Sequence, residues 1–319
     1  MVRDVLRTAA AAACALALAA CGATTEVTAP PGVPDADCGT VTIAVNPWVG
    51  YRANVAVVGY LLERELGCTV IEKALTENES WEGLTGGSVD VILENWGHDD
   101  LKKKYIDDAR TAVELGLTGN KGVIGWYVPP WMAAEYPDIT DWRNLNKYAG
   151  LFATAASGGK GRFLDGDPSF VTNDAALIAN LKLDYTVSYA GSEEKLIAAF
   201  RAAEANRSPL IGYFYEPQWL LSEIDLVHVS LPRYTPGCDA DPQTVACDYQ
   251  PYDLDKIGRK KFADSGSPAA ELIKRFQWTN ADQNAVARDL TVAQLPPDQA
   301  AKRWLDGHGT TWKSWIPKD

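Results

Sequence analysis

Short apolar runs alternate with longer amphipathic segments along most of the chain, a pattern typical of α/β proteins. The apolar runs predict strands at 41–45, 70–73, 89–94, 122–128, 151–155, 187–189, 210–215 and 226–229. Apolar positions at helical spacing predict helices near 53–66, 79–84, 102–110, 172–181, 193–206, 268–278, 280–289 and 296–307. We therefore expect an α/β fold built from strand–helix–strand units.

The expected elements fall into two groups. Strand-like crossings near 122–128 and 210–217 predict two α/β lobes joined by two hinge strands. Residues 38–124 together with 217–319 form the first expected lobe, and residues 125–216 form the second. A ligand is then expected in the cleft between the lobes.

The N-terminal segment has the pattern of a processing signal. Arg3 and Arg7 precede an apolar stretch at 9–20 that is too short to cross a bilayer as a helix. The sequence Leu18-Ala19-Ala20-Cys21 resembles a bacterial lipobox, which implies that residues 1–21 are a signal peptide ending at a lipidated Cys21. An ordinary secretory signal with an incidental cysteine is the alternative.

Residues 22–37 are rich in Ala, Thr and Pro and predict a flexible tether. Two acyl chains on Cys21 give stable anchoring. We therefore expect an exported protein, lipid-anchored to the outer face of the bacterial cell membrane.

Four cysteines follow this segment, and none lies in a Cys-x-x-Cys pair. Zinc and thioredoxin-like chemistry are therefore not indicated. Cys38 and Cys68 each precede an expected strand, and Cys238 and Cys247 bracket a polar loop. Four cysteines allow three pairings, and these positions favour 38–68 with 238–247 over four free thiols in an oxidising compartment.

Charge and motif content narrow the function classes. The net charge is −12, and basic residues cluster only at 102–104 and 259–261, so nucleic acid is not an expected partner. The chain has three histidines and lacks both Gly-x-Ser-x-Gly and His-Glu-x-x-His, which argues against an exported hydrolase. The Gly-rich segment 157–161 lacks the ending of a phosphate-binding loop. No cofactor or metal is expected, and a monomer is the default.

The apolar run 89–94 ends in Asn95-Trp96-Gly97-His98. In open α/β sheets, ligands bind at the carboxyl ends of strands. An indole in that place is either core or a wall for a cation without hydrogen-bond donors, because the ring face attracts cations.

Several segments together carry a resemblance to a known family. They are Glu94-Asn95-Trp96-Gly97-His98, Asp167-Pro168-Ser169-Phe170, Tyr213-Phe214-Tyr215-Glu216-Pro217-Gln218-Trp219 and Phe276-Gln277-Trp278 with Asn280 and Asn284. Over essentially the whole chain after residue 37, the sequence resembles the glycine betaine/choline class of substrate-binding proteins of ABC importers. The resemblance implies a type II periplasmic-binding-protein fold, capture of a quaternary ammonium solute without chemistry, and delivery to a membrane permease.

The resemblance also implies a box of aromatic faces around the cationic nitrogen. The matching positions are Trp96, Phe170, Tyr215 and Trp48, with Tyr213, Trp126 and Phe214 as second choices. Phe170 and Tyr215 stand where the family commonly has Trp, which leaves the preferred ligand open. Glycine betaine or proline betaine is expected, and choline or carnitine is the alternative.

A betaine carboxylate needs hydrogen-bond donors. The expected helix start at Val171 and Thr172 offers backbone N–H groups, and Val49 and Gly50 offer a second helix start. His98 is a candidate for a charge-assisted hydrogen bond.

Two other ligand classes predict different partners. Choline has no carboxylate, and Glu94 or Glu216 would then be the acid near the cation. An amino-acid ligand would instead require an Arg in the cleft, for which Arg52 is the candidate.

Overall fold

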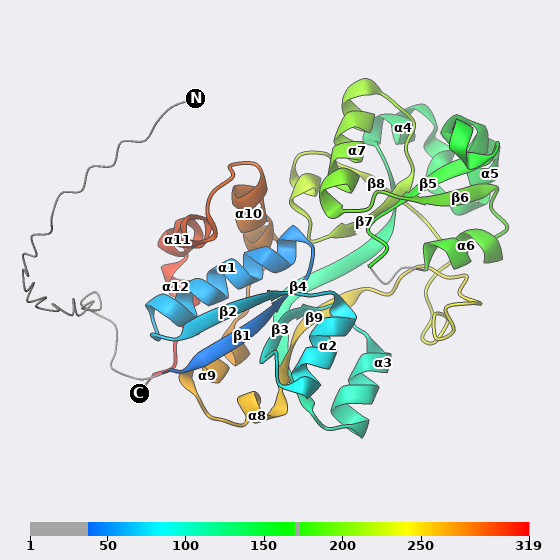
Figure 1. Ribbon diagram of the computed structural model, residues 1–319. Coiled ribbons are helices and arrows are strands. Elements are labelled where there is room, and N and C mark those ends of the chain that lie inside the picture. Colours follow the sequence, from blue (N-terminus) through cyan, green and yellow to red (C-terminus); the bar gives the residue numbers. More distant parts are fainter. Residues whose placement is uncertain (1–37, 170–172, 319) are drawn as a thin grey trace, which may run out of the picture. The chain divides into compact units, whose positions relative to one another are not determined.

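A long strand, β4 (Ala112–Val128), connects the two halves of the sheet in the computed structural model, which describes residues 38–169 and 173–318 (Figure 1). Its first part pairs antiparallel with β9 (Tyr252–Arg259). Its second part pairs antiparallel with β7 (Gly212–Glu216) and with β8 (Val227–Val229). Within the described residues the sheet has nine strands, ordered β2-β1-β3-β9-β4-β7-β5-β6, with β8 attached to β4.

The first half of the sheet contains three parallel strands. They are β1 (Thr40–Val45), β2 (Thr69–Ala74) and β3 (Val91–Asn95). From β1 the chain moves outward to β2 and then returns past β1 to β3, so right-handed crossovers place the two connecting helices on opposite faces. These helices are α1 (Val49–Arg64) and α2 (Glu77–Gly86). Covered on both faces, β3 is buried along its whole length.

The C-terminal helices complete this half. Helices α10 (Asn280–Thr291) and α11 (Pro297–Gly307) pack against α1, whereas α3 (Asp99–Lys102) lies on the side of α2 (Figure 1). The shorter helices α8 (Lys260–Ala263), α9 (Pro268–Arg275) and α12 (Gly309–Trp312) follow β9 and close the chain.

The second half of the sheet is smaller. Parallel strands β5 (Gly161–Asp165) and β6 (Tyr185–Tyr189) extend it beyond β7. Its helices are α4 (Pro130–Glu135), α5 (Leu145–Tyr148), α6 (Asp174–Asn180) and α7 (Glu193–Asn206). Phe200 of α7 packs edge-on against Phe214 of β7, and both rings are fully buried.

Several elements differ from the sequence-based prediction, among them the following three. The segment 151–155, expected as a strand, instead lies in two 3₁₀ turns, Ala149–Phe152 and Ala155–Ser157. Of the residues 151–155, only Phe152 is buried. The helix expected at 102–110 continues α3 as a π-helix, Lys103–Asp108. Strand β9 was not expected, because the charged Asp255 and Lys256 lie in its buried middle and hide its apolar pattern.

The path between the two halves also differs. Both β7 and β8 stay beside the second part of β4, and the chain returns to the first half at β9, where Tyr252 pairs with Gly122. After β7 the 3₁₀ turn Trp219–Ser222 contacts α10 of the first half, so the chain reaches that half near 217–222 as well as near 250–252. By its pairing β8 belongs to the second half, although 217–319 was expected to join the first lobe.

Two disulfides brace the fold. Cys38–Cys68 ties the start of β1 to the start of β2, where Thr40 pairs with Thr69. Cys238–Cys247 closes a loop with a sequence separation of 9. These are the two pairs that the positions along the chain favoured.

The expected signal peptide 1–21, the lipidation site Cys21 and the tether 22–37 lie outside the described residues. Within residues 38–169 and 173–318, none of the helices has the length and apolar character needed to cross a membrane.

Candidate functional site

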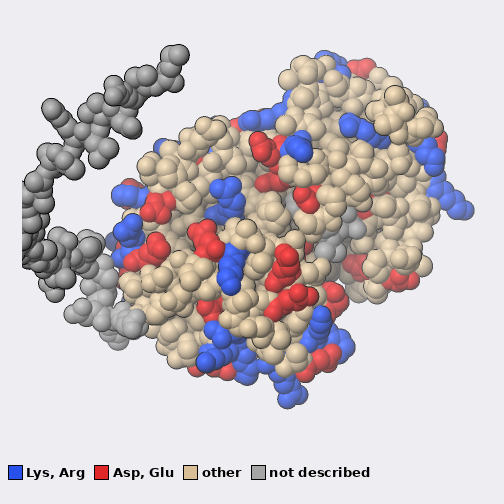
Figure 2. Space-filling model, in the orientation of Figure 1, with Lys and Arg blue, Asp and Glu red and all other residues tan. Residues whose placement is uncertain are grey.

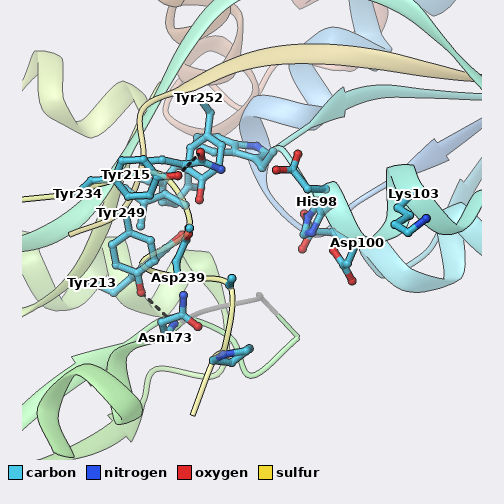
Figure 3. A pocket seen from close by; sticks show the side chains of 18 of the residues that line it. His98, Asp100, Lys103, Asn173, Tyr213, Tyr215, Tyr234, Asp239, Tyr249 and Tyr252 are labelled. Atoms are coloured by element: carbon cyan, nitrogen blue, oxygen red, sulfur yellow. Dashed lines mark hydrogen bonds and ion pairs between the residues drawn. The ribbon is translucent and has the colours of Figure 1, made fainter. Parts of the chain in front are cut away.

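A cavity of about 740 Å³ lies where β3, β4, β7 and the start of β9 meet. Aromatic side chains form much of its wall (Figure 3). They are Trp48, Trp96, Tyr213, Tyr215, Tyr234, Tyr249 and Tyr252. The cavity therefore presents ring faces and edges from segments that lie far apart in the sequence.

Trp96, which directly follows β3, is the centre of this aromatic wall. Its indole meets Tyr215 edge-on, with 5.8 Å between ring centroids and an interplanar angle of 88°. On another side it meets Tyr252 at 5.9 Å and 66°. The ring lies against β4 at Gly122, where a Cβ would come within 2.6 Å of Trp96 Cζ3. A glycine at this position of β4 is what allows the indole to lie so close to the strand.

The carboxylate of Glu94 holds two cavity indoles together. Its Oε1 accepts hydrogen bonds from Trp48 Nε1 at 2.7 Å and from Trp96 Nε1 at 2.8 Å. Its Oε2 accepts from Asn54 Nδ2 at 2.5 Å and from Gln283 Nε2 at 2.8 Å. Glu94 is 1% exposed, and this burial raises the pKa of its carboxyl in spite of the four donors.

Two tyrosines of the cavity wall are also held by acids. Tyr215 donates its hydroxyl hydrogen to Glu193 at the start of α7. Tyr249 donates to Asp174 Oδ1 at 2.9 Å and accepts a hydrogen bond from the backbone N–H of Asn173 at 3.0 Å (Figure 3). Burial, and next the charge of Asp165, raise the pKa of Asp174 well above its ordinary value.

Acidic groups outnumber basic ones in the described lining. The acids are Glu77, Asp99, Asp100 and Asp239, and the basic side chains are His98 and Lys103. Over the molecular face drawn in Figure 2, acidic and basic side chains are interspersed. The local excess of carboxylates around the cavity therefore favours a ligand with positive charge.

His98 is paired within this lining. Its Nε2 lies 2.9 Å from Glu77 Oε1. Burial by itself lowers the pKa of His98, but the hydrogen bond and charge of Glu77 outweigh it, and the pKa is raised. The His98–Glu77 pair closes one side of the cavity.

Trp48, Trp96, Tyr215 and His98, all expected from the sequence, line the cavity. Phe170, Val171 and Thr172 lie outside the described residues, and the next residue, Asn173, lines the cavity.

The second predicted carboxylate site, at the start of α1, is arranged differently. The backbone N–H of Val49 donates to Glu193 Oε2 at 2.8 Å, and Gly50 lies beside the Gln283 side chain. These two residues do not line the cavity, and the first N–H group of α1 already has a partner in Glu193.

The structure also places the acids considered for choline and the arginine considered for an amino-acid ligand. Glu94 lies behind the indoles as their acceptor, and Glu216 accepts a hydrogen bond from Asn280 Nδ2 at 3.2 Å. Arg52 does not line this cavity but lines a second one, which is considered below.

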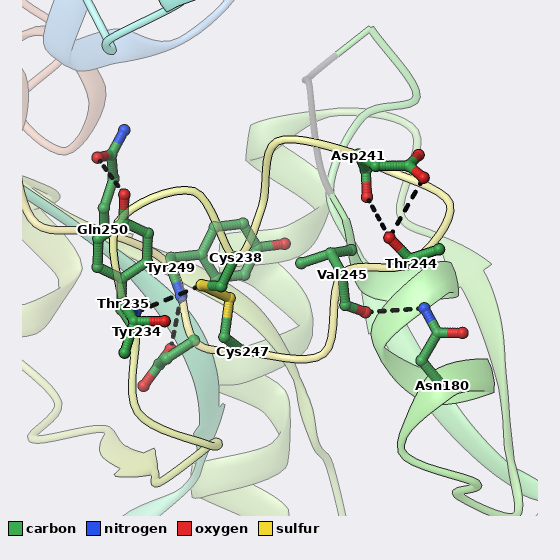
Figure 4. Close-up of a disulfide and its surroundings, with 11 residues drawn as sticks. Asn180, Tyr234, Thr235, Cys238, Asp241, Thr244, Val245, Cys247, Tyr249 and Gln250 are labelled. Carbon is green, nitrogen blue, oxygen red and sulfur yellow. Dashed lines mark hydrogen bonds between the residues drawn. A yellow bond between two sulfur atoms is a disulfide. The ribbon is translucent and has the colours of Figure 1, made fainter.

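Sequence reasoning missed one wall of the cavity. Asp239 lies in the loop closed by Cys238–Cys247, and Tyr249 and Tyr252 follow this loop in the chain. Figure 4 shows the disulfide and Tyr249 beside it. Asn180 of α6 holds this loop by donating to Val245 O at 2.8 Å. The available signal was the aromatic pair in Tyr249-Gln250-Pro251-Tyr252, which begins two residues after Cys247.

Comparisons with known proteins identify the family of this chain. Residues 39–307 match the family described as the substrate binding domain of the ABC-type glycine betaine transport system. The trimethylamine N-oxide-binding protein of Pelagibacter ubique (strain HTCC1062) is 27% identical over 246 residues, which span 74% of this chain and 73% of that protein.

Solved structures share the fold. Lactococcal OpuAC in its closed, liganded conformation with glycine betaine aligns with a TM-score of 0.67 and 19% identity over 88% of this chain and 100% of the other. An ABC-transporter choline binding protein in complex with choline aligns with a TM-score of 0.69 and 17% identity over 88% and 93% of the two chains. The chain has the type II periplasmic-binding-protein fold and belongs to the family of substrate-binding domains of ABC-type glycine betaine transport systems.

Proposed function

We propose that this protein captures a small solute with a fully alkylated, positively charged nitrogen and delivers it to an ABC permease. Glycine betaine or proline betaine is the proposed ligand. The observation that carries the proposal is the pair of indoles, Trp48 and Trp96, that share Oε1 of the buried Glu94 at the cavity wall.

The physical argument rests on what such a nitrogen lacks. It has no N–H donors, so its best partners are ring faces and nearby negative charge rather than hydrogen-bond acceptors. A desolvated cation–π contact contributes about 2 kcal/mol. Three such ring faces, together with the electrostatic field of nearby acids, give a binding free energy of the order needed for micromolar affinity, about 8 kcal/mol.

Two further ligands have specific support. The excess of acids in the described lining favours choline, which carries a net positive charge. The relative from Pelagibacter ubique is a trimethylamine N-oxide-binding protein, and that solute presents the same trimethylated nitrogen. Carnitine shares the trimethylated nitrogen with both.

Calorimetric titration tests the proposal directly. The purified protein is titrated with glycine betaine, proline betaine, choline, carnitine and trimethylamine N-oxide, and with dimethylglycine as a ligand that keeps an N–H. We expect micromolar binding for at least one fully alkylated ligand and weaker binding of dimethylglycine. Trp96→Ala abolishes binding, whereas Trp312→Ala, in α12 outside the cavity lining, leaves it unchanged. Heat release for none of these ligands, from a folded sample, contradicts the proposal.

We also propose that the protein is exported and anchored through lipid on Cys21. Expression in a bacterium supplied with a labelled fatty acid tests this. The label is expected on the wild-type chain and not on Cys21→Ser, which is expected to leave the membrane fraction. Equal labelling of both proteins would exclude Cys21 as the anchor.

A further inference from the structure

The N-terminus of α1 is capped from a distant part of the chain. A helix begins with N–H groups that have no partner inside the helix. Trp48 precedes α1 and supplies no side-chain cap. Instead, the N–H of Val49 donates to Oε2 of Glu193 at 2.8 Å, across a sequence separation of 144. Glu193 is the first residue of α7, in the other half of the sheet.

The other oxygen of the same carboxylate holds a cavity ring. Oε1 of Glu193 accepts hydrogen bonds from the hydroxyl of Tyr215 and from Gln218 Nε2, the latter at 2.5 Å. Glu193 is 8% exposed. The side chain of Glu193 therefore links the ring of Tyr215, which lines the cavity, to the start of α1, directly after the cavity residue Trp48.

Glu193 lies on a partition between two cavities. A second cavity of about 690 Å³ is lined by Val49, Glu193 and Trp219, among others. Trp48 lines both cavities, whereas Tyr215 lines only the larger one. Because Glu193 already borders this second cavity, separation of the two halves would admit water to its carboxyl group.

We propose that Glu193 is a positioning residue that couples ligand capture to the approach of the two lobes. Its carboxyl group orients Tyr215 toward the ligand and caps α1 only while the lobes are in contact. The proposal rests on the proposed function, because the ligand it assumes occupies the aromatic cavity. Ligand binding favours the arrangement in which Glu193 holds Tyr215. In that arrangement Glu193 also accepts the hydrogen bond from the backbone N–H of Val49.

Several charged or titratable groups face or surround Glu193. Glu94 of β3 and Tyr215 of β7 act on its carboxylate, and Arg52, Glu194 and Arg201 line the same second cavity. Burial raises the pKa of Glu193 from the ordinary 4.5 to about 7, against the lowering effect of its three hydrogen-bond donors.

This pKa gives the coupling a pH signature. When the lobes separate and water reaches the carboxyl, its pKa returns toward the ordinary value. Between pH 4.5 and 7 the closed form then binds more protons than the open form. Ligand affinity is therefore expected to be highest below this window and to fall as pH rises through it. Because each pKa unit corresponds to a factor of ten, the fall is roughly tenfold to a hundredfold.

The test uses two variants and a matched control. Glu193→Ala removes the acceptor of three buried donors, and Glu193→Gln keeps one oxygen but cannot titrate. Glu194→Gln is the control, since it makes the same charge change at the next, exposed position of α7. Affinity for glycine betaine, choline and trimethylamine N-oxide is measured by calorimetry from pH 5 to 8 for each protein.

We expect Glu193→Ala to weaken binding at least roughly tenfold, because it leaves three buried donors without their acceptor. Glu193→Gln is expected to lose the fall in affinity that the wild type shows, whereas Glu194→Gln keeps it. The pKa of His98 is raised above its ordinary value by the hydrogen bond and charge of Glu77, so the pH profile of Glu193→Gln, and not a flat line, is the reference. Wild-type affinity and pH profile in both Glu193 variants would overturn the proposal.

Hydrogen exchange at the Val49 amide provides a readout without ligand. Loss of the cap in Glu193→Ala is expected to speed this exchange, and Glu194→Gln is expected to leave it unchanged. If the wild type binds none of the solutes, the proposed function fails. Hydrogen exchange at Val49 would then still test whether Glu193 holds the lobes together. Unchanged exchange in Glu193→Ala would refute this role of Glu193 independently of the ligand.

Discussion

The indole of Trp96 lies against Gly122 so closely that a Cβ at position 122 would approach Cζ3 to 2.6 Å. Trp96 follows β3 and Gly122 lies in β4, where it pairs with Tyr252 of β9. The glycine thus provides the space for the ring at the point where β4 passes from one half of the sheet to the other. The aromatic wall depends on a residue that contributes no side chain to it.

The first prediction concerns this contact. Gly122→Ala is expected to displace the Trp96 ring and to lower the affinity for the cavity ligand roughly tenfold, because a 1 Å displacement is enough to spoil a preorganised site. Calorimetry measures the affinity, and the change in tryptophan fluorescence on ligand addition reports the ring. Gly150→Ala is the control, since a Cβ there meets nothing within 4 Å. Equal affinities for the two variants would mean that the ring position is not set by Gly122.

The second prediction separates two roles of Glu94. Glu94→Ala leaves the indole N–H groups of Trp48 and Trp96 without an acceptor and is expected to cost about 3 kcal/mol or more. Glu94→Gln is expected to cost less. Asn54 Oδ1 and Gln283 Oε1 have no hydrogen-bond partner among the described residues, so both amides can rotate to accept from the new amide group.

Thermal unfolding measures this difference. A loss of 1 kcal/mol lowers Tm by roughly 2–4 °C in a chain of this order of size. Glu94→Ala should therefore melt about 6 °C or more below the wild type, with Glu94→Gln between the two. A Glu94→Gln protein that melts below Glu94→Ala would contradict the proposed rotation of the amides.

The third prediction concerns two of the three histidines. The hydrogen bond and charge of Glu77 outweigh burial and raise the pKa of His98 above 6.5, whereas burial lowers the pKa of His228 below 6.5. For His98, the pair with Glu77 stabilises the fold fully below pH 6.5, and this stabilisation is lost as pH rises through the higher folded-state pKa.

Proton NMR of the imidazole signals measures these pKa values, and His98→Gln assigns the relevant signal. Glu77→Gln is expected to lower the pKa of His98 and to leave that of His228 unchanged. It is also expected to weaken the dependence of unfolding free energy on pH above 6.5. A His98 pKa below that of His228 would show that the pair does not form in solution.

The fourth prediction compares the two disulfides. Replacing Cys238 and Cys247 by Ser is expected to cost about 2–3 kcal/mol of stability and to weaken ligand binding, because the freed loop carries Asp239 into the cavity wall and leads into Tyr249. Replacing Cys38 and Cys68 opens a longer loop, with a sequence separation of 30, and is expected to cost about 3–4 kcal/mol.

Neither Cys38 nor Cys68 lines the cavity, so that second variant is expected to bind ligand like the wild type below its melting temperature. Chemical denaturation gives the stabilities, and calorimetry gives the affinities. A loss of affinity in both variants alike would show that the loop position is not what the Cys238–Cys247 bond controls.

Some of this structure could be predicted because the relevant physics is local. The strand 41–45, the helix 193–206 and the strand end at Trp96 each show their pattern within a few residues. The apolar run before Trp96 predicted a buried strand, and the carboxyl end of such a strand is a general ligand position. Trp48, Tyr215 and His98 entered through their places in motifs, and the structure places all three at the cavity with Trp96.

Other features depended on contacts that no local pattern records. Strand β9 carries buried charges in its middle, where Asp255 is paired with Lys102 and Lys256 donates to Phe276 O at 2.5 Å. The strand therefore lacked the alternation or apolar run that signals a strand, and with it the wall formed by Tyr249 and Tyr252 was missed.

The sequence by itself determined the alternation of strands and helices, the cysteine positions and the aromatic strand end at Trp96, because these follow from periodicity and spacing along the chain. Only the tertiary structure decided that Glu94 serves two indoles and that Glu193 serves both Tyr215 and Val49. Val49 and Glu193 are separated by 144 positions, so they become hydrogen-bond partners only because the two halves of the sheet meet there. That packing is a property of the whole fold.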